Sequence, residues 1–245
     1  MITDYIEKAS KPLSLDATRN TRDLGGYPTE DGKTTRLARF LRSDPPSGLT
    51  VHDLEYLGTY DIGCVIDLRT DLEISRAPDS EIPGARYENY PLLDGLQSDR
   101  VKGDYPPSMT ELYVGLLERS QDTLLKVFRS MLATKGCVLF HCTGGKDRTG
   151  VIAMLLLKLA GVSDELVVAD YTVSAYYMKD SFDAQRAYLK KAGIYAPDFV
   201  MESEPETMVQ TLSYLDKRYG GSKNYLLHIG LSEDEVSFLH DRLVG

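Results

Sequence analysis

The fold of this chain is decided by the stretch Val138-Leu139-Phe140-His141-Cys142-Thr143-Gly144-Gly145-Lys146-Asp147-Arg148-Thr149-Gly150. Its apolar beginning, residues 138–140, predicts a short buried strand. The apolar run that starts at Val151 predicts a helix reaching about Ala160, where Gly161 ends it. Residues 142–147 must then form a loop between the end of a strand and the start of a helix. The amide N–H groups of such a loop can turn inward and hold an anion.

The rest of the chain predicts strands and helices on both sides of this loop. Short apolar or alternating runs predict three more strands, at residues 39–42, 64–68 and 86–90. Capping signals predict one helix that begins at Thr50 and another that begins at Ser232. The helical spacing of apolar residues predicts two more helices, at residues 109–119 and 121–134. Strands that alternate with helices and give way to a helical tail indicate one α/β domain with an α-helical C-terminal part.

The composition is that of a soluble globular protein. The chain has 245 residues, with 28 basic and 37 acidic side chains, and therefore a net charge of −9 at pH 7. This charge argues against a general nucleic-acid binder, because a polyanion is repelled. The longest apolar stretch, residues 151–157, is far shorter than the ~20 residues that span a bilayer, and the N-terminus does not read as a signal peptide. Three cysteines do not make a disulfide framework, so we expect a cytoplasmic protein without an integral membrane segment.

The spacing of Cys142 and Arg148, with a five-residue loop between them, predicts a cysteine-dependent phosphate site. Gly144 and Gly145 give the backbone the freedom for a tight wrap around an anion. Arg148 at the helix start can bind two phosphate oxygens with its planar guanidinium, so no metal is needed to stabilise their charge. The same donors stabilise the thiolate of Cys142, which can attack phosphorus and form a phosphocysteine that water hydrolyses. The Thr149 hydroxyl can donate to the sulfur as the thiolate leaves.

Other interpretations of this loop fit less well. Gly145-Lys146 resembles part of a nucleotide P-loop, but Asp147 stands where that motif needs Ser or Thr, and Phe140 stands where it needs its first glycine. Sulfurtransferases and arsenate reductases also pair a loop cysteine with an arginine, but the Lys-Asp-Arg-Thr-Gly continuation argues against them. A non-catalytic module that binds phosphoproteins or phosphoinositides on the same fold is a further alternative, which the intact cysteine, arginine and threonine disfavour.

Three segments together resemble the microbial tyrosine-phosphatase-like family. Residues 141–150 match every defined position of its His-Cys-x-x-Gly-Lys-Asp-Arg-Thr-Gly pattern. Residues 20–27 resemble its Asn-x-Arg-Asp-x-Gly-Gly motif, and residues 67–73 resemble its Asp-Leu-Arg-x-x-x-Glu motif. The segment from Tyr219 to Ser232 is similar to the family's C-terminal helical region, so the resemblance covers most of the chain.

The resemblance implies a cysteine-phosphatase fold over residues 1–245, with a central, mostly parallel sheet flanked by helices and a helical elaboration from about residue 165. It implies a metal-independent, cofactor-free enzyme that hydrolyses phosphotyrosine, and in some members phosphoserine, phosphothreonine or phosphoinositides, with inorganic phosphate as product. The expected phosphate-binding residues are those of the loop: Thr143, Gly144, Gly145, Lys146 and Thr149. The family associates the Lys146 position with the broader, lipid-inclusive specificity, and its point charge can meet a second phosphate. Residues 171–195 then form either a helical lid over the cysteine or an ordinary amphipathic surface.

The general acid has three candidates. The chain has no tryptophan, so the Trp-Pro-Asp loop that supplies the acid in many tyrosine phosphatases is absent. The resemblance suggests Asp147, although its two basic neighbours favour the ionised form. Asp94 and Asp104, in a long glycine- and proline-containing loop at residues 91–108, are the alternatives.

Four further charged residues of the motifs are expected to brace the site or to contact substrate at its entrance, and not to catalyse: Arg22, Asp23, Asp67 and Arg69. His141 is expected to point away from the nucleophile and to bind the backbone. The four histidines lack the spacing of metal ligands, so no metal site is expected. Cys64 can pair with Cys142 on oxidation if their strands are neighbours, whereas Cys137 lies too far along the same strand.

Overall fold

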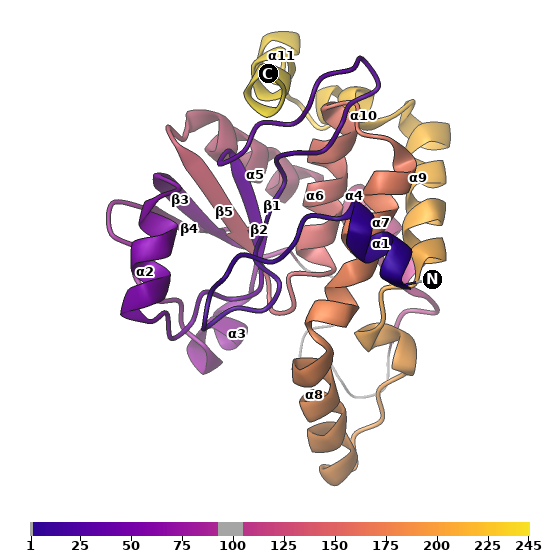
Figure 1. Cartoon of the computed structure of the whole chain (residues 1–245). Helices are drawn as coiled ribbons and strands as arrows, with labels where there is room; N and C mark the ends of the chain where they lie inside the picture. The colour runs from indigo at the N-terminus through magenta and orange to yellow at the C-terminus, as the bar shows by residue number, and fades with distance from the viewer. Residues whose placement is uncertain (1, 93–104) are drawn as a thin grey trace.

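A five-stranded sheet forms the centre of the fold (Figure 1). The computed structural model describes residues 2–92 and 105–245. The strands are β1 (Arg22–Asp23), β2 (Phe40–Ser43), β3 (Ile62–Asp67), β4 (Arg86–Asn89) and β5 (Cys137–His141). They lie in the order β1-β2-β5-β3-β4; β1 runs antiparallel to β2, and the other pairs are parallel. The expected mostly parallel sheet is confirmed, with the strand that precedes the loop at its centre.

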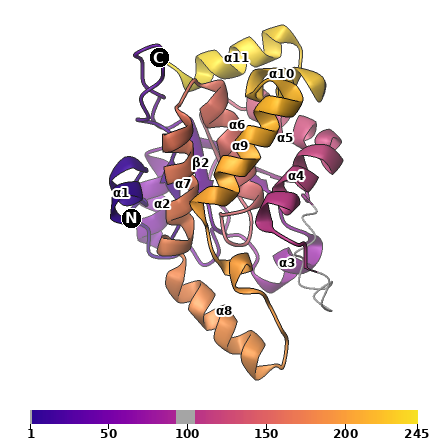
Figure 2. The same cartoon turned by 90° about the vertical axis from the view of Figure 1, so that its right-hand side faces the viewer.

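Helices cover both faces of this sheet. They are α1 (Ile2–Lys8), α2 (Val51–Gly58), α3 (Asp71–Arg76), α4 (Met109–Arg119), α5 (Gln121–Ala133), α6 (Arg148–Leu159), α7 (Asp164–Tyr177), α8 (Lys179–Lys191), α9 (Pro205–Tyr219), α10 (Ser222–His228) and α11 (Glu233–Leu243). A 3-10 turn, η1 (Asp198–Met201), lies between α8 and α9. Figure 2 shows α4, α6, α7 and α9 packed beside one another. The expected α-helical C-terminal part is confirmed.

The position of β5 explains why this strand is apolar from Cys137 to Phe140. Val138 and Phe140 point into the larger core, which includes residues of α4, α5 and α6. Cys137 and Leu139 point into a smaller core beside α2. Because successive side chains of a strand alternate between its two faces, a strand buried on both faces must be continuously apolar.

Local signals in the sequence predict the helix ends well. The helices predicted at residues 109–119 and 121–134 are α4 and α5, within one residue. Thr50 and Ser232 begin α2 and α11 through the expected capping boxes. Gly161 follows the end of α6 with a φ of 78°, which glycine adopts readily. None of the helices in the described ranges is long and apolar enough to cross a bilayer.

Candidate active site

The loop of residues 142–147 lies at the carboxyl ends of the parallel strands, where β5 runs into α6. Ligands of open α/β sheets bind at this edge. A pocket of about 360 Å³ opens there, lined by Cys142, Asp147 and Arg148 from the loop and by Glu73 from α3. Residues of α8 and η1 line it as well. The structure therefore brings the three residues that the sequence analysis assigned to catalysis into one pocket.

Two side chains hold the backbone of the loop from behind. Asn20 donates its Nδ2 hydrogens to the carbonyl oxygens of Gly144 and Gly145, at 3.1 and 3.2 Å. Arg42 donates to the same Gly145 oxygen at 2.6 Å. Because the N–H of a trans peptide points opposite to its C=O, the N–H groups that follow these carbonyls face away from both side chains. Gly145 has a φ of +60°, and a Cβ atom there would lie 2.6 Å from the carbonyl carbon of Ser43, so this position requires glycine.

A buried carboxylate on α7 pairs with both arginines beneath the loop. Asp170 pairs with Arg42, and with Arg22 at 3.2 Å; the Tyr27 hydroxyl also donates to it at 3.1 Å. Burial by itself would raise the pKa of Asp170, but Arg42 and Arg22 hold it below its ordinary value. Arg22 also donates to the side chain of Asn20, which holds the loop. Arg22 is thus a structural support, in agreement with the prediction from the sequence.

Glu73 binds the guanidinium of Arg148 with both carboxylate oxygens, at 2.9 and 2.6 Å. Thr143 donates its hydroxyl to Glu73 Oε1 at 2.5 Å. Burial by itself would raise the pKa of Glu73, but hydrogen bonds and charge from Arg148, together with the Thr143 hydroxyl, lower it to about 2. Glu73 is therefore ionised at neutral pH and fixes the orientation of Arg148.

The sequence analysis did not give Glu73 a role. This residue ends the Asp-Leu-Arg-x-x-x-Glu segment and forms a capping box with Thr70 at the start of α3. The capping signal can be recognised in the sequence, but it indicates only where a helix begins. The contact with Arg148 joins residues 75 positions apart, and no local pattern predicts it.

Asp147 lies between the pocket and two buried tyrosines. The Tyr113 hydroxyl of α4 donates to Asp147 Oδ1 at 2.5 Å, and the hydroxyl oxygens of Tyr113 and Tyr171 are 2.9 Å apart. Lys146 Nζ lies 3.3 Å from the same Asp147 oxygen. Burial and the nearby charge of Asp147 raise the pKa of Tyr113 well above its ordinary value, so this tyrosine keeps its proton. The Asp147 carboxyl group is therefore held in one place at the edge of the pocket.

Comparison with known proteins agrees with this geometry. The sequence profile of the tyrosine phosphatase family matches residues 13–245. The chain belongs to this family.

A tyrosine-protein phosphatase of Nostoc commune is 34% identical over 223 residues, which cover 83% of this chain and 74% of that protein. A putative tyrosine-protein phosphatase of Cupriavidus necator is 30% identical over 229 residues, 87% of this chain and 82% of that protein. The triple specificity protein phosphatase PtpB of Mycobacterium tuberculosis is 29% identical over 255 residues, 94% of this chain and 87% of that protein. The family expected from the three motifs is confirmed, and the protein is a phosphatase.

In this phosphatase the Lys146 side chain is directed at η1 and the segment that follows it. Its Nζ donates to the carbonyl oxygens of Val200 and Glu202, at 2.7 and 2.6 Å. It also lies 5.7 Å from the centre of the Phe182 ring on α8. The side chain is 0% exposed. Lys146 thus links η1 and α8 to the phosphate loop, whereas the sequence left its charge either to meet a second phosphate or to lie in solvent.

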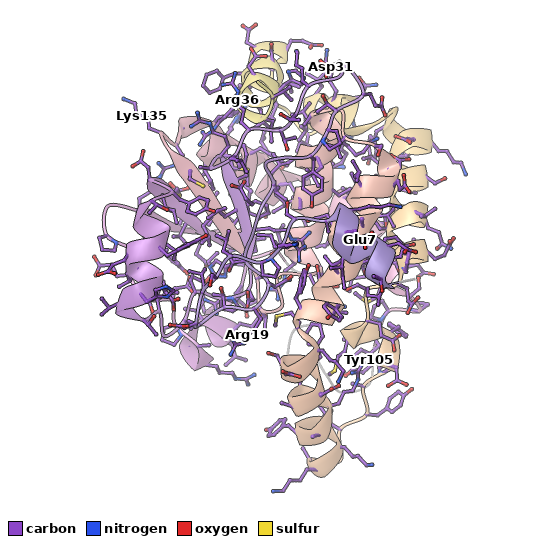
Figure 3. The ribbon with its side chains drawn as sticks, viewed as in Figure 1. Glu7, Arg19, Asp31, Arg36, Tyr105 and Lys135 are labelled. Atoms are coloured by element: carbon purple, nitrogen blue, oxygen red, sulfur yellow. The ribbon has the colours of Figure 1, made fainter. Side chains whose placement is uncertain are left out.

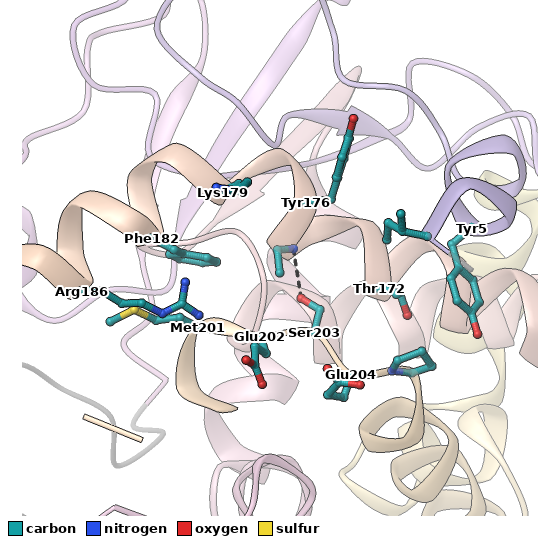
Figure 4. A pocket seen from close by; sticks show the side chains of 13 residues that line it. Tyr5, Thr172, Tyr176, Lys179, Phe182, Arg186, Met201, Glu202, Ser203 and Glu204 are labelled. Atoms are coloured by element: carbon teal, nitrogen blue, oxygen red, sulfur yellow. Dashed lines mark hydrogen bonds between the residues drawn. The ribbon is translucent and has the colours of Figure 1, made fainter. Parts of the chain in front are cut away.

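Phe182 and Met201 separate the active-site pocket from a second cavity. Both side chains line the pocket and also a cavity of about 500 Å³, which is bounded by α1, α7, α8 and the segment before α9 (Figure 4). Together with Met178 they form a small apolar cluster of their own, apart from the main core. The two hydrogen bonds of Lys146 hold η1 and the residue after it, whereas α8 is held by this cluster and by the contact of Phe182 with Lys146.

His141 lies against a carboxylate. Its Nε2 is 2.8 Å from Asp79 Oδ2, and the ring is fully buried. Neither ring nitrogen has a hydrogen bond to the backbone of the described residues, so the predicted backbone bond is wrong. The physical reason is that Asp79 follows α3 and is brought to His141 by Arg69, which donates to Asp79 Oδ1 at 2.6 Å. Arg69 also binds both carboxylate oxygens of Asp67 and lines the active-site pocket, so it braces this motif and lies where a substrate would enter.

Two groups of three residues among those described bring possible metal ligands within 4.8 Å of one another: Asp67, Asp79 and His141, and Asp16, His52 and Asp53. In the first group the guanidinium of Arg69 lies against both carboxylates and already supplies their positive charge. In the second, the Asp53 carboxylate accepts hydrogen bonds from the backbone N–H groups of Thr50 at the start of α2 and of Asp16 and Ala17. Both groups therefore fit structural networks better than cation sites.

The three cysteines are free thiols. Strands β3 and β5 are neighbours, but their register places Cys64 opposite Val138, four residues before Cys142. At a rise of about 3.3 Å per residue, this register separates the two cysteines by about 13 Å. The predicted pairing of Cys64 with Cys142 is therefore wrong.

Replacing Glu73 by glutamine is expected to weaken the fold in a pH-dependent way. The folded-state pKa of Glu73, about 2, lies below its ordinary value of 4.5, so its stabilisation is complete above pH 4.5 and is lost as the pH falls toward 2. We expect the free energy of unfolding of the variant to be lower by on the order of 3 kcal/mol at pH 7, with the difference shrinking as the pH falls through this range. Denaturant unfolding of both proteins at several pH values measures this difference. A difference that does not change with pH would contradict the role of the Glu73 charge.

Proposed function

We propose that this phosphatase hydrolyses phosphotyrosine in proteins through a phosphocysteine formed on Cys142. The observation that carries the proposal is the arrangement of one loop: Cys142 and Arg148 line the same pocket, and the carbonyl groups between them are tied back by Asn20 and Arg42. Such a loop binds an anion with its N–H groups. The relatives that are named tyrosine-protein phosphatases support phosphotyrosine as the substrate.

In the first step, the Cys142 thiolate attacks phosphorus; an S–P bond forms, and the P–O bond to the leaving alcohol breaks. The N–H groups of the loop and the Arg148 guanidinium stabilise the charge on the equatorial oxygens. Glu73 keeps the guanidinium oriented during this step, because it holds the Nη1 and Nη2 atoms with a carboxylate that is itself fixed at the start of α3.

In the second step, water attacks phosphorus, the S–P bond breaks, and inorganic phosphate leaves. The departing thiolate is stabilised by a hydroxyl donor at Thr149. This side chain is fully buried, and its Oγ1 has no hydrogen-bond partner among the described residues, so its proton is available. The chemistry we propose uses neither metal nor cofactor.

We assign the general acid to Asp147, which protonates the leaving oxygen in the first step and takes a proton from water in the second. It lines the pocket beside Cys142. The Tyr113 hydroxyl can donate to the ionised carboxylate and can accept from the protonated one, because Tyr171 offers Tyr113 a second partner. The other candidates, Asp94 and Asp104, lie outside the described residues.

Asp147→Asn is expected to slow the hydrolysis of esters with poor leaving groups by about 10²-fold, because the amide cannot give up a proton. Esters with activated leaving groups, such as p-nitrophenyl phosphate, should lose much less. Steady-state rates on a series of aryl phosphates that differ in leaving-group pKa test this assignment. Tyr113→Phe serves as the matched control, because it removes a hydrogen bond from Asp147 and keeps the carboxyl group. A uniform loss along the series in Asp147→Asn would contradict the role of an acid.

We extend the proposed substrates to phosphoserine, phosphothreonine and phosphoinositides. The support is the similarity to a phosphatase named for triple specificity. We further propose that α8 and η1 act as a lid within a single domain, since Lys146 links them to the loop and cavities lie on both sides. The three free thiols support a reducing, cytoplasmic location.

A further inference from the structure

The far end of α8 and the turn that follows it project from the body of the protein. Both views show this helix extending beyond the other elements, with the turn at its outermost point (Figures 1 and 2). We refer to residues 186–195 as the α8 tip. The base of the same helix contributes Ser181, Phe182 and Gln185 to the active-site pocket. The tip is thus a rigid extension of one wall of the active site.

The α8 tip presents apolar and aromatic side chains to the solvent. Tyr188 is 69% exposed, Tyr195 76% and Ile194 37%. Leu189, next to Tyr188, packs instead on the cluster of Met178, Phe182 and Met201. The helix therefore holds itself on the protein through Leu189, while Tyr188 on the helix and Tyr195 in the turn after it stay mostly exposed. Exposed apolar groups gathered at one place mark interaction sites.

The α8 tip and the residues that flank it are positively charged, whereas the protein as a whole is negatively charged. Residues 184–197 contain Arg186, Lys190 and Lys191 and no acidic residue, in a chain with a net charge of −9. Arg186 pairs with Asp183 toward the base of the helix. Lys190 and Lys191 are exposed and have no ion pair with any described residue. The outermost part of the molecule is therefore basic and aromatic, and the rest is acidic.

We propose that the α8 tip docks on the surface of an anionic lipid bilayer. Lysine side chains are attracted to anionic headgroups, and tyrosine side chains prefer the interface between headgroups and acyl chains. A convex tip can enter this soft layer, whereas a protein partner would have to offer a matching groove. The acidic remainder of the surface would be repelled, so the attraction is confined to this one point and fixes the orientation of the protein.

Docking by the tip would bring the active site close to the bilayer. Lys191 lies six residues beyond Gln185 on α8, which is about 9 Å along the helix axis. The pocket would then face phosphate esters on or immediately above the membrane surface, either lipid headgroups or phosphorylated segments of membrane proteins. This last step rests on the proposed phosphatase function, whereas the docking itself does not.

Co-sedimentation with lipid vesicles tests the docking. The wild-type protein should bind vesicles of phosphatidylcholine that contain phosphatidylserine, and should not bind phosphatidylcholine alone. Each removed lysine should weaken the binding about fivefold, so Lys190→Glu/Lys191→Glu should weaken it at least about 25-fold. Tyr188→Ser/Tyr195→Ser should also weaken it. The control is Lys126→Glu/Lys135→Glu, which changes the net charge of the protein by the same amount as the tip variant. Lys126 lies on α5, and Lys135, labelled in Figure 3, follows that helix; both are far from α8.

The rate on a soluble ester, p-nitrophenyl phosphate, should be the same in the wild type and in all three double variants, because none of these residues lines the pocket. Unchanged rates together with lost sedimentation would support docking by the tip. Failure of the wild type to sediment, or equal losses in the control, would overturn it. Tip variants that still bind vesicles but turn over a phosphoprotein more slowly would assign the tip to a protein partner and would also contradict the proposal. An inactive wild type that nevertheless sediments would refute the proposed function and leave the docking standing.

Discussion

Cys142→Ser is expected to lower kcat on p-nitrophenyl phosphate by about 10⁵-fold or more, because a neutral serine hydroxyl is a much weaker nucleophile than a thiolate. The phosphate loop keeps its N–H donors and Arg148, so phosphate or tungstate should still bind. Steady-state rates without added metal, and calorimetric titration with tungstate, measure the two effects.

Cys64→Ser is the matched control for this variant. Cys64 is also a buried cysteine at a strand position of the same sheet, but it lies opposite Val138 and away from the pocket. We expect its kcat to stay within a few fold of the wild type. Full activity of Cys142→Ser, or activity of the wild type that requires added metal, would refute the proposed mechanism. A wild-type protein that binds phospho-ligands without turnover would support the alternative of a binding module.

Arg148→Lys is expected to lower kcat/KM by about 10³-fold, although it keeps the positive charge. An ammonium group cannot bind both oxygens of Glu73 in parallel and still present a flat edge to the phosphate. The contacts of residue 148 with the phosphate group should weaken in the ground state and in the transition state alike. Steady-state kinetics on p-nitrophenyl phosphate and the binding of tungstate therefore both measure the effect.

Glu73→Gln makes a useful comparison with Arg148→Lys. The glutamine variant keeps the guanidinium and loses only the carboxylate that orients it, so its kcat/KM should fall by about tenfold, less than that of Arg148→Lys. Equal rates for Arg148→Lys and the wild type would show that charge alone is sufficient at this position, and would contradict the bidentate geometry as the basis of the function.

Much of the fold follows from signals that are local in the sequence. The strand before Cys142, the glycines after it and the apolar helix beyond Arg148 lie within about 20 residues, and each is predicted by a pattern of its own. The candidate site is predictable to the same degree, because Cys142 and Arg148, the proposed nucleophile and phosphate-binding residue, lie on this one segment. The capping boxes at Thr50 and Ser232 are local in the same way.

The residues that were missed or misplaced depend on contacts between distant segments. Glu73 reaches Arg148 across 75 positions, and Lys146 reaches the carbonyl groups of Val200 and Glu202 across more than 50. The sequence of the loop cannot show that its lysine will meet carbonyl oxygens instead of solvent. The Cys64 prediction was wrong for a related reason: neighbouring strands can be inferred from the order of elements, but register is set by the packing of the whole sheet.

The ion pair beneath the loop bears on how the enzyme is synthesised. Arg42 precedes Asp170 by 128 positions, and chains emerge from the ribosome N-terminus first. A nascent chain that has reached α6 already contains the cysteine that we propose as the nucleophile, but the two arginines beneath the loop still lack the Asp170 carboxylate with which they pair. The loop therefore acquires this support only once α7 has emerged and docked. The proposed nucleophile is made early, and the support of its loop is completed late.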